Sequence, residues 1–218
     1  MKTAVVIGAG GHAKALIETL RTDDSVRIAA VLDADPQRRG TDFMGLEILG
    51  GDDLLEELAA QGADSFVVGL GSIGNTTVRR KVWDRAEAAG LKPLAVISPA
   101  AWVSQSAEIG PGCQILPGAV VMPDCRLGRG VIVNTGAQAD HDCTIGDFCH
   151  LAPGAVLSGN VTVGDDAHLG VGCRVLQGMV IGSHALVGAG AVVVQDVNPR
   201  TVVMGVPARE KPPKEPRT

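Results

Sequence analysis

A six-residue repeat runs without a break from Ile97 to Val193, and it constrains the fold of this chain more than any other feature. Of the 17 positions that step by six through this stretch, 16 are Ile, Leu or Val, and Ala139 is the exception. Such a period indicates one short strand and one corner per repeat, with each aliphatic side chain turned inward. Three repeats close a triangular coil of 18 residues, so residues 97–198 are expected to form between five and six coils of a parallel β-helix.

Two other positions of the repeat support this interpretation. The position four residues after each aliphatic holds eight Ala, five Cys, three Val and one Met. These five are all the cysteines of the chain, so we interpret them as small interior hydrophobes and not as metal ligands or nucleophiles: Cys113, Cys125, Cys143, Cys149 and Cys173. The position three residues after each aliphatic is Gly, Asp or Asn in 13 of 17 repeats, and these residue types tolerate a left-handed backbone at a corner.

Composition agrees with a thin, repetitive interior and excludes some functions. Aromatic residues make up only 2% of the chain, while there are 29 glycines. The net charge of −5 lacks the basic footprint of a nucleic-acid-binding protein. No run of 18 apolar residues occurs and no signal-peptide pattern opens the chain, so we expect no membrane contact and a cytoplasmic location.

The residues before the repeats follow a different pattern. Residues 3–7 (Thr-Ala-Val-Val-Ile) predict a buried strand. A glycine-rich segment at residues 8–13 follows it, and then a helix. A second predicted strand, residues 28–32, ends at Asp33. This order is typical of a Rossmann-like α/β fold, in which the helix N-terminus holds a phosphate and the acid holds a ribose hydroxyl.

Two further helices and one strand, predicted at residues 52–61, 75–89 and 65–69, use up the space before the repeats. That is about half of a full dinucleotide fold. Because backbone N–H groups and a helix dipole suit any pyrophosphate, a nucleotide sugar fits this site as well as NAD does.

A short Gly-Gly-His βαβ segment followed by uninterrupted hexapeptides resembles the hexapeptide-repeat sugar acyltransferases, of the sialic acid O-acetyltransferase and UDP-4-amino-sugar N-acetyltransferase type. Residues 204–209 (Met-Gly-Val-Pro-Ala-Arg) also resemble the segment that ends many of these helices. The resemblance covers nearly the whole chain. Within the family, it is strongest to the N-acetyltransferases of 4-amino-sugar nucleotides, of the GDP-perosamine type.

The resemblance implies a left-handed β-helix and three parts: a nucleotide-sugar-binding domain (1–95), an acyltransferase domain (96–198) and a C-terminal capping tail (199–218). It also implies acetyl-CoA as cosubstrate, no metal, and a homotrimer with its sites between adjacent helices. The family's nucleotide-sugar contacts fall here on Gly10, Gly11, His12, Asp33, Asp35 and Gly71. Its acetyl-CoA contacts fall on His150, Val171 and Ala189.

His141 is the candidate general base. It lies two residues after Ala139, so strand alternation turns it outward, and aspartates flank it on both sides. A carboxylate beside an imidazole fixes its tautomer and raises its basicity. Residues 134–146 resemble the family segment that carries the base, and the family's base-tuning acid falls on Asp142. We therefore expect direct acetyl transfer to an amine, with no acyl-enzyme.

The other histidines of the repeats have different expected roles. His150 follows His141 by nine residues, half a coil, so the two are expected to meet only across a subunit contact, where His150 would help to stabilise the oxyanion. His168 and His184 are expected to be surface residues.

Three other functions remain open on the sequence. An O-acetyltransferase of a sialic-acid-like sugar has the same architecture. An interfacial zinc enzyme of the γ-carbonic anhydrase type needs three converging histidines, whereas the spacings here are 9, 18 and 16 without a close pair on one strand. A non-catalytic nucleotide-sugar sensor would bind the sugar without releasing CoA.

Overall fold

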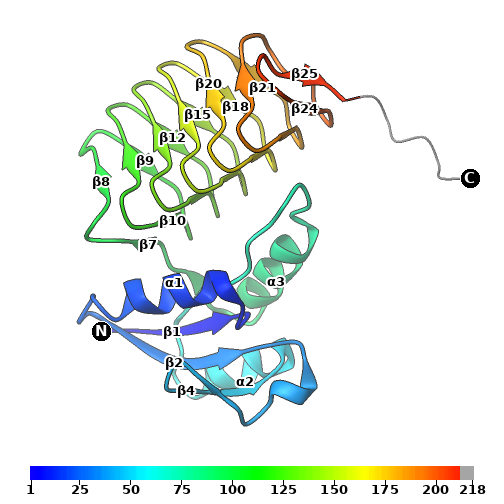
Figure 1. Cartoon of the computed structure of the whole chain (residues 1–218). Coiled ribbons are helices and arrows are strands. Elements are labelled where there is room, and N and C mark those ends of the chain that lie inside the picture. Colours follow the sequence, from blue (N-terminus) through cyan, green and yellow to red (C-terminus); the bar gives the residue numbers. More distant parts are fainter. Residues whose placement is uncertain (212–218) are drawn as a thin grey trace, which may run out of the picture.

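The computed structural model describes residues 1–211, so the last part of the expected capping tail lies outside the described residues. An α/β unit lies along one side of a left-handed parallel β-helix whose coils stack in chain order (Figure 1). Within residues 1–211, no helix is long and apolar enough to cross a membrane.

The α/β unit contains a six-stranded sheet in the order β3-β4-β2-β1-β5-β6. Its strands are β1 (Lys2–Ile7), β2 (Val26–Leu32), β3 (Asp42–Phe43), β4 (Leu46–Gly50), β5 (Ser65–Val68) and β6 (Lys92–Pro93). Its helices are α1 (Gly11–Leu20), α2 (Leu55–Ala60) and α3 (Thr77–Ala88), with 3-10 turns η1 (Pro36–Arg38) and η2 (Asp52–Leu54). Neighbouring strands run parallel except in the β3–β4 hairpin.

The predicted strands and helices of this unit are confirmed to within a few residues. β1 lies in the middle of the sheet, and its residues Ala4, Val5 and Val6 are fully buried, as a strand covered on both faces requires. The sheet also contains β3, β4 and β6, which the sequence patterns do not predict. These strands are too short or too polar to give a recognisable strand pattern.

The β-helix has three sheets, one along each side of the triangular coil. The first, called here the covered sheet, contains β7 (Val96–Ile97), β10 (Gln114–Ile115), β13 (Ile132–Val133), β16 (His150–Leu151), β19 (His168–Leu169), β22 (Leu186–Val187), β24 (Val202–Met204) and β25 (Arg209–Glu210). The second sheet contains β8 (Trp102–Val103), β11 (Val120–Val121), β14 (Gln138–Ala139), β17 (Val156–Leu157), β20 (Arg174–Val175) and β23 (Val192–Val193). The third sheet contains β9 (Glu108–Ile109), β12 (Arg126–Leu127), β15 (Thr144–Ile145), β18 (Thr162–Val163) and β21 (Val180–Ile181).

Strands pair in parallel with the 18-residue register that the repeat predicts, as in Gln114 with Ile132 and Val120 with Gln138. The repeat aliphatics are buried from Ile115 to Val193, and Ala139 is buried with them. Ile97 is 45% exposed because no coil lies beneath the first one.

Of the 13 repeats with Gly, Asp or Asn three residues after the aliphatic, all but the one with Asp196 have the predicted left-handed backbone at that corner. Phe148 and His184 adopt the same conformation, with φ of 57° and 60°. Such a conformation is unfavourable for a bulky residue. The Phe148 ring packs edge-on against Trp83 of α3, with centroids 5.1 Å apart, so contact with the α/β unit compensates for this corner.

All five cysteines are buried and unpaired, as their place in the repeat predicts. Burial raises the pKa of Cys113 to about 11 and the pKa values of Cys149 and Cys173 to about 12. These thiols therefore stay protonated at neutral pH and are poor nucleophiles.

We predict that the five thiols do not react with Ellman's reagent in the native protein at pH 7.5 and that all five react after unfolding in guanidinium. Burial slows the reaction at all five positions, and protonation slows it further at Cys113, Cys149 and Cys173. The hydrogen bond with Cys143 lowers the pKa of Cys125 to about 7, so burial alone protects that thiol. A thiol that is labelled within seconds in the native state would show that at least one cysteine is not an interior residue.

Candidate active site

The outward side chains of the covered sheet form a column that the α/β unit buries. Its members are spaced by 18 residues and are at most 7% exposed from the first coil to the fifth: Val96, Gln114, Ile132, His150 and His168. The prediction of a surface position for His168 is therefore wrong. Its ring lies edge-on to His150, with centroids 5.0 Å apart. The surface position predicted for His184 is confirmed.

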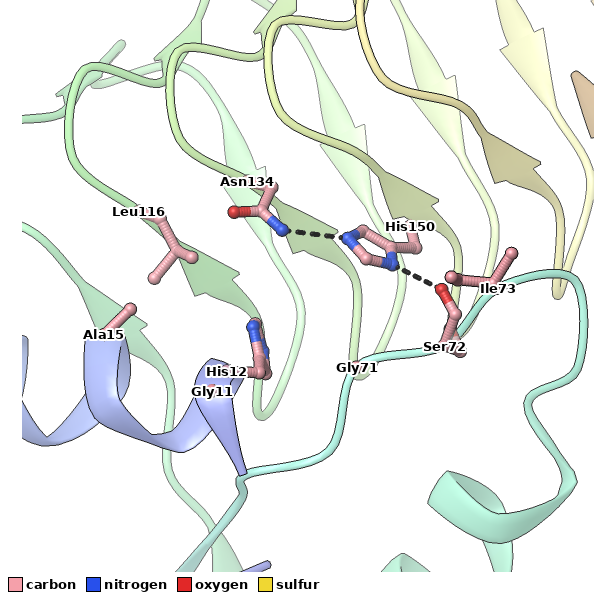
Figure 2. Close-up of a pocket in the computed structure, with 9 residues that line it drawn as sticks. All are labelled: Gly11, His12, Ala15, Gly71, Ser72, Ile73, Leu116, Asn134 and His150. Carbon is pink, nitrogen blue, oxygen red and sulfur yellow. Dashed lines mark hydrogen bonds between the residues drawn. The ribbon is translucent and has the colours of Figure 1, made fainter. Parts of the chain in front are cut away.

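A cavity of about 450 Å³ lies between the α/β unit and this column (Figure 2). It brings together four of the predicted site residues, Gly11, His12, Gly71 and His150. The other residues that line it are Ala15, Ser72, Ile73, Leu116 and Asn134.

The glycine turn opens toward this cavity. Gly10 caps α1, and a Cβ added at Gly10 or Gly11 would meet no atom within 4 Å, so the start of the helix is open to a ligand. Gly8 is needed for a different reason. It has a φ of 99°, and a Cβ there would collide with the Leu70 side chain.

Asp33 and Asp35 do not line this cavity. The Asp33 carboxylate accepts hydrogen bonds from the backbone N–H of Ala9 at 3.0 Å and from the Arg38 guanidinium at 2.8 Å, so it anchors the glycine turn. Asp33 also lines a separate, mostly apolar cavity of about 150 Å³. Asp35 caps η1 through the backbone N–H of Gln37.

His150 is held neutral by its neighbours. Its Nδ1–H donates to the carbonyl oxygen of Ser72 at 2.9 Å, and its Nε2 accepts from the Asn134 side-chain amide at 3.0 Å (Figure 2). Burial lowers the pKa of His150 to about 3. Because both ring nitrogens are engaged, His150 has no free N–H for an oxyanion in this arrangement.

His141 lies at the corner after β14, on the other edge of the second sheet from Asn134, and its side chain is 51% exposed as predicted. Its Nδ1 is 2.7 Å from the Asp142 carboxylate, and this hydrogen bond raises the pKa of His141. The backbone N–H of His141 donates to Asp140. In the next coil a Cβ at Gly159 would lie 2.5 Å from the His141 ring, so the glycine leaves room for the imidazole.

Val171 and Ala189 occupy equivalent corners, one coil apart, after β19 and β22. Both are exposed. Neither of their backbone N–H groups has a partner within residues 1–211, so this corner offers donors to a ligand.

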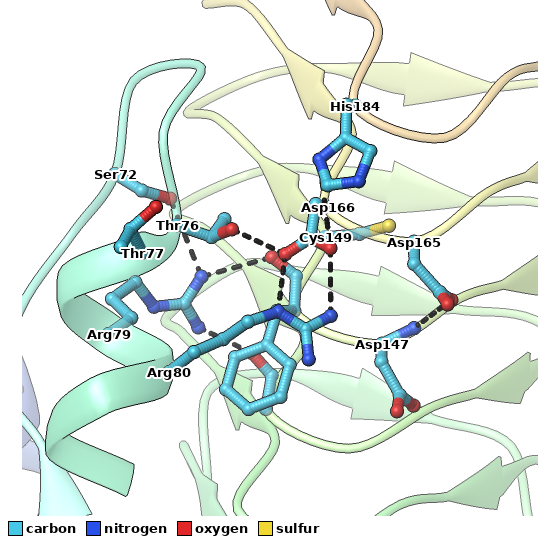
Figure 3. Close-up of polar contacts among 12 residues, drawn as sticks. Ser72, Thr76, Thr77, Arg79, Arg80, Asp147, Cys149, Asp165, Asp166 and His184 are labelled. Atoms are coloured by element: carbon cyan, nitrogen blue, oxygen red, sulfur yellow. Dashed lines mark hydrogen bonds and ion pairs between the residues drawn. The ribbon is translucent and has the colours of Figure 1, made fainter. Parts of the chain in front are cut away.

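A cluster of polar contacts, called here the α3 latch, holds the start of α3 against the β-helix (Figure 3). Arg80 donates to both oxygens of Asp166, at 2.7 and 2.8 Å, and Thr76 also donates to this carboxylate. Arg79 donates to the carbonyl oxygens of Phe148 and Gly130. The latch fixes the end of the segment that carries Gly71, Ser72 and Ile73 into the cavity.

Burial alone would raise the pKa of Asp166, but the hydrogen bonds from Arg80 and Thr76 outweigh it and hold that pKa below its ordinary value. The ion pair between Arg80 and Asp166 therefore stabilises the fold at pH values above the ordinary carboxyl pKa. This contribution is lost as the pH falls through the lowered pKa of Asp166.

We predict that Arg80→Met lowers the free energy of unfolding by about 3 kcal/mol, because it removes the guanidinium that donates to both oxygens of the buried Asp166 carboxylate. Urea denaturation at pH 7 measures this loss, which should shrink in acid as Asp166 takes up a proton. Arg85→Met is the matched control on the same helix. Arg85 is 50% exposed in its pair with Asp52, so the change should be below about 1 kcal/mol. Equal losses in the two variants would contradict the latch.

Six residues that line or shape the cavity are not identifiable as site residues by the sequence analysis: Ala15, Ser72, Ile73, Gln114, Leu116 and Asn134. The sequence contains a signal for one of them, Gln114. Gln114 and the two histidines are polar members of an outward column whose other buried members, Val96 and Ile132, are apolar. That mixture indicates a sheet face covered by another part of the chain with polar contacts across it.

Two family models match the chain. The model described as PglD N-terminal domain matches residues 3–86, and the model described as Bacterial transferase hexapeptide (six repeats) matches residues 106–138 and 142–177. No curated protein sequence matches the chain significantly.

Several solved structures are similar over nearly the whole chain. A His-to-Asn variant of perosamine N-acetyltransferase from Caulobacter crescentus, in complex with CoA and GDP-perosamine, is 40% identical, with 97% of each chain covered and a TM-score of 0.90. The acetyltransferase domain of PglB from Neisseria gonorrhoeae is 36% identical, with 97% of this chain and 100% of that chain covered and a TM-score of 0.87. WeeI from Acinetobacter baumannii is 30% identical, with coverages of 97% and 100% and a TM-score of 0.84.

These matches extend over both the α/β unit and the β-helix, and the family models divide between the same two parts. The chain therefore belongs to the hexapeptide-repeat sugar acyltransferase family, and it is an enzyme of the sugar N-acetyltransferase group.

Proposed function

We propose that this enzyme transfers the acetyl group of acetyl-CoA to the 4-amino group of a nucleotide-linked amino sugar, with GDP-perosamine as the expected acceptor. The observation that carries the proposal is the contact between His141 and Asp142. It places an exposed imidazole of raised pKa at a corner of the hexapeptide helix, where a substrate can reach it. The relatives from Caulobacter crescentus, solved with CoA and GDP-perosamine, support this choice of substrates.

The 450 Å³ cavity is the proposed site of the nucleotide sugar. The open start of α1, at Gly10 and Gly11, suits the diphosphate because unpaired N–H groups and the helix dipole favour negative charge there. His12 and Gly71 would contact the sugar side. Asp33 and Asp35 would serve the nucleoside, with Asp33 sharing its carboxylate between a ribose hydroxyl and Arg38.

The corner that carries Val171 and Ala189 is the proposed site of acetyl-CoA. Its unpaired backbone N–H groups suit the amide carbonyls of the pantetheine arm. His150 lies on the covered sheet beside this corner, so its proposed contact with acetyl-CoA is made by a neutral ring. The PglB domain from Neisseria gonorrhoeae, solved with acetyl coenzyme A, supports the cosubstrate.

A homotrimer would complete the site. Apolar side chains face solvent on the second sheet and beside it. Trp102 on β8 is 52% exposed, and Leu176 and Val194, which directly follow β20 and β23, are 48% and 39% exposed. A surface of this kind favours contact with another copy of the chain. His141 lies at one edge of this sheet and Asn134, which lines the cavity, at the other. Packing through the sheet would therefore bring the base of one subunit toward the cavity of the next.

In the proposed reaction the neutral sugar amine attacks the thioester carbonyl of acetyl-CoA. His141 Nε2 takes up the amine proton, while its Nδ1–H is held by Asp142. The ring N–H of His150 is already donated to the carbonyl oxygen of Ser72, so it is not free for the oxyanion. Backbone N–H groups stabilise the oxyanion instead. The C–S bond then breaks as the proton passes to the thiolate, and the products are the N-acetylated sugar nucleotide and CoA.

We predict that His141→Ala lowers kcat by roughly 10²–10⁴-fold, the usual cost of losing a positioned base, without loss of fold. Asp142→Asn removes the group that raises the pKa of His141, so the acidic limb of the kcat/KM profile should move to lower pH while the plateau falls. His184→Ala, at an exposed corner of the same helix, is the control and should stay within a few-fold of wild type. A His141→Ala enzyme as active as this control would remove His141 from the mechanism.

The acceptor is tested by thiol release from acetyl-CoA with a panel of nucleotide sugars that carry either an amine or a hydroxyl at C4. The proposal expects release with the amines, and most rapid release with GDP-perosamine. Release with hydroxyl acceptors alone would make the enzyme an O-acetyltransferase, and sugar binding without any release would make it a sensor.

A further inference from the structure

Gln114 joins the two parts of the molecule through one buried amide. It lies on β10 in the outward column of the covered sheet and is 2% exposed. Its Nε2 donates to the carbonyl oxygen of Val68, at the end of β5, at 2.8 Å. Its Oε1 is 2.6 Å from Nε2 of His12.

These two contacts determine where the proton of His12 lies. The Val68 carbonyl can only accept, so the amide nitrogen of Gln114 must face it, and the amide oxygen must then face His12. An amide oxygen also only accepts, so His12 Nε2 must carry the hydrogen. Nδ1 is left as a lone pair, and no hydrogen bond to it occurs within residues 1–211.

The surroundings keep the His12 ring neutral. Burial lowers the pKa of His12 and outweighs the hydrogen bond to Gln114, while the Arg79 guanidinium lowers it further. The other titratable group facing the ring is His150, whose centroid is 6.4 Å away and which is itself neutral. His12 therefore lines the cavity as a neutral imidazole with one acceptor (Figure 2).

We infer that Gln114 is a positioning residue that fixes His12 as the Nε2–H tautomer, so that His12 Nδ1 accepts a hydrogen bond from a hydroxyl or neutral amine of the sugar. The inference rests on the proposed function, because it names a contact to that acceptor. It also gives His12 a role distinct from phosphate binding. A lone pair repels a phosphate oxygen, whereas a fixed acceptor discriminates strongly against a sugar that lacks the matching donor.

The test is Gln114→Glu, which keeps the shape, replaces the N–H donor that faces the Val68 carbonyl by an acceptor oxygen, and places a negative charge beside His12. A carboxylate in place of the amide attracts a second proton to His12, so the ring becomes an imidazolium with no acceptor. We expect the KM for the nucleotide sugar to rise at least tenfold near neutral pH, with kcat and the KM for acetyl-CoA nearly unchanged. The KM should recover as the pH is raised and His12 loses the added proton. Nitrogen-15 NMR should show the Nε2–H tautomer of His12 in the wild type and the imidazolium in the variant.

Two further variants separate positioning from simple packing. Gln114→Met keeps the volume without either hydrogen bond, so its KM should rise without recovering at high pH. Gln114→Met also provides the test of the two hydrogen bonds if Gln114→Glu does not fold. Gln105→Glu adds the same charge at an exposed corner of the first coil and should change neither KM nor the NMR signals.

In a His12→Ala background, Gln114→Glu should have no additional effect on KM, because the residue acts through that ring. Additive effects, or a Gln114→Glu enzyme with unchanged KM and tautomer, would overturn the inference. A wild-type enzyme that acetylates no amino-sugar nucleotide would instead contradict the proposed function, and the NMR measurement would still decide the tautomer.

Discussion

The burial of one side of the β-helix by the α/β unit is the contact on which the rest of the structure depends. A hexapeptide coil satisfies its own interior, but the outward residues of the covered sheet, such as Val96 and Ile132, are apolar and need a partner. The α/β unit supplies it. Two polar members of the same column, Gln114 and His150, donate hydrogen bonds to the buried backbone carbonyls of Val68 and Ser72. Leaving a buried carbonyl without a donor would destabilise the fold.

These polar contacts converge on the segment between β5 and α3. Gln114 holds its beginning at Val68, His150 holds its middle at Ser72, and the α3 latch holds its end. The cavity wall formed by this segment is therefore set by the β-helix and not by the α/β unit alone. That arrangement explains how a glycine turn typical of dinucleotide-binding folds can instead face a sugar acyltransferase helix, with His12 oriented by a residue about a hundred positions away in the sequence.

Periodic features could be predicted from the sequence, and features that depend on contact between the two parts could not. The inward aliphatics, the buried cysteines and the exposed His141 follow from position in the repeat alone. The left-handed corner at Phe148 opposes local preference and is stabilised by Trp83 of α3. The outward repeat position of His168 predicts a surface residue, yet the α/β unit buries it. The roles of Asp142 and the ligand-contacting residues rest on family resemblance and remain proposals.

We propose that the base of one subunit serves the cavity of another, because His141 and the cavity lie at opposite edges of the second sheet. A crystal structure of the assembled enzyme with CoA and the amino-sugar nucleotide measures this directly. We expect His141 Nε2 of one protomer within about 3 Å of the acceptor nitrogen, or one water away from it, with the sugar seated against the partner's glycine turn. An imidazole that no acceptor nitrogen approaches, or a complete site within a single protomer, would contradict this shared site.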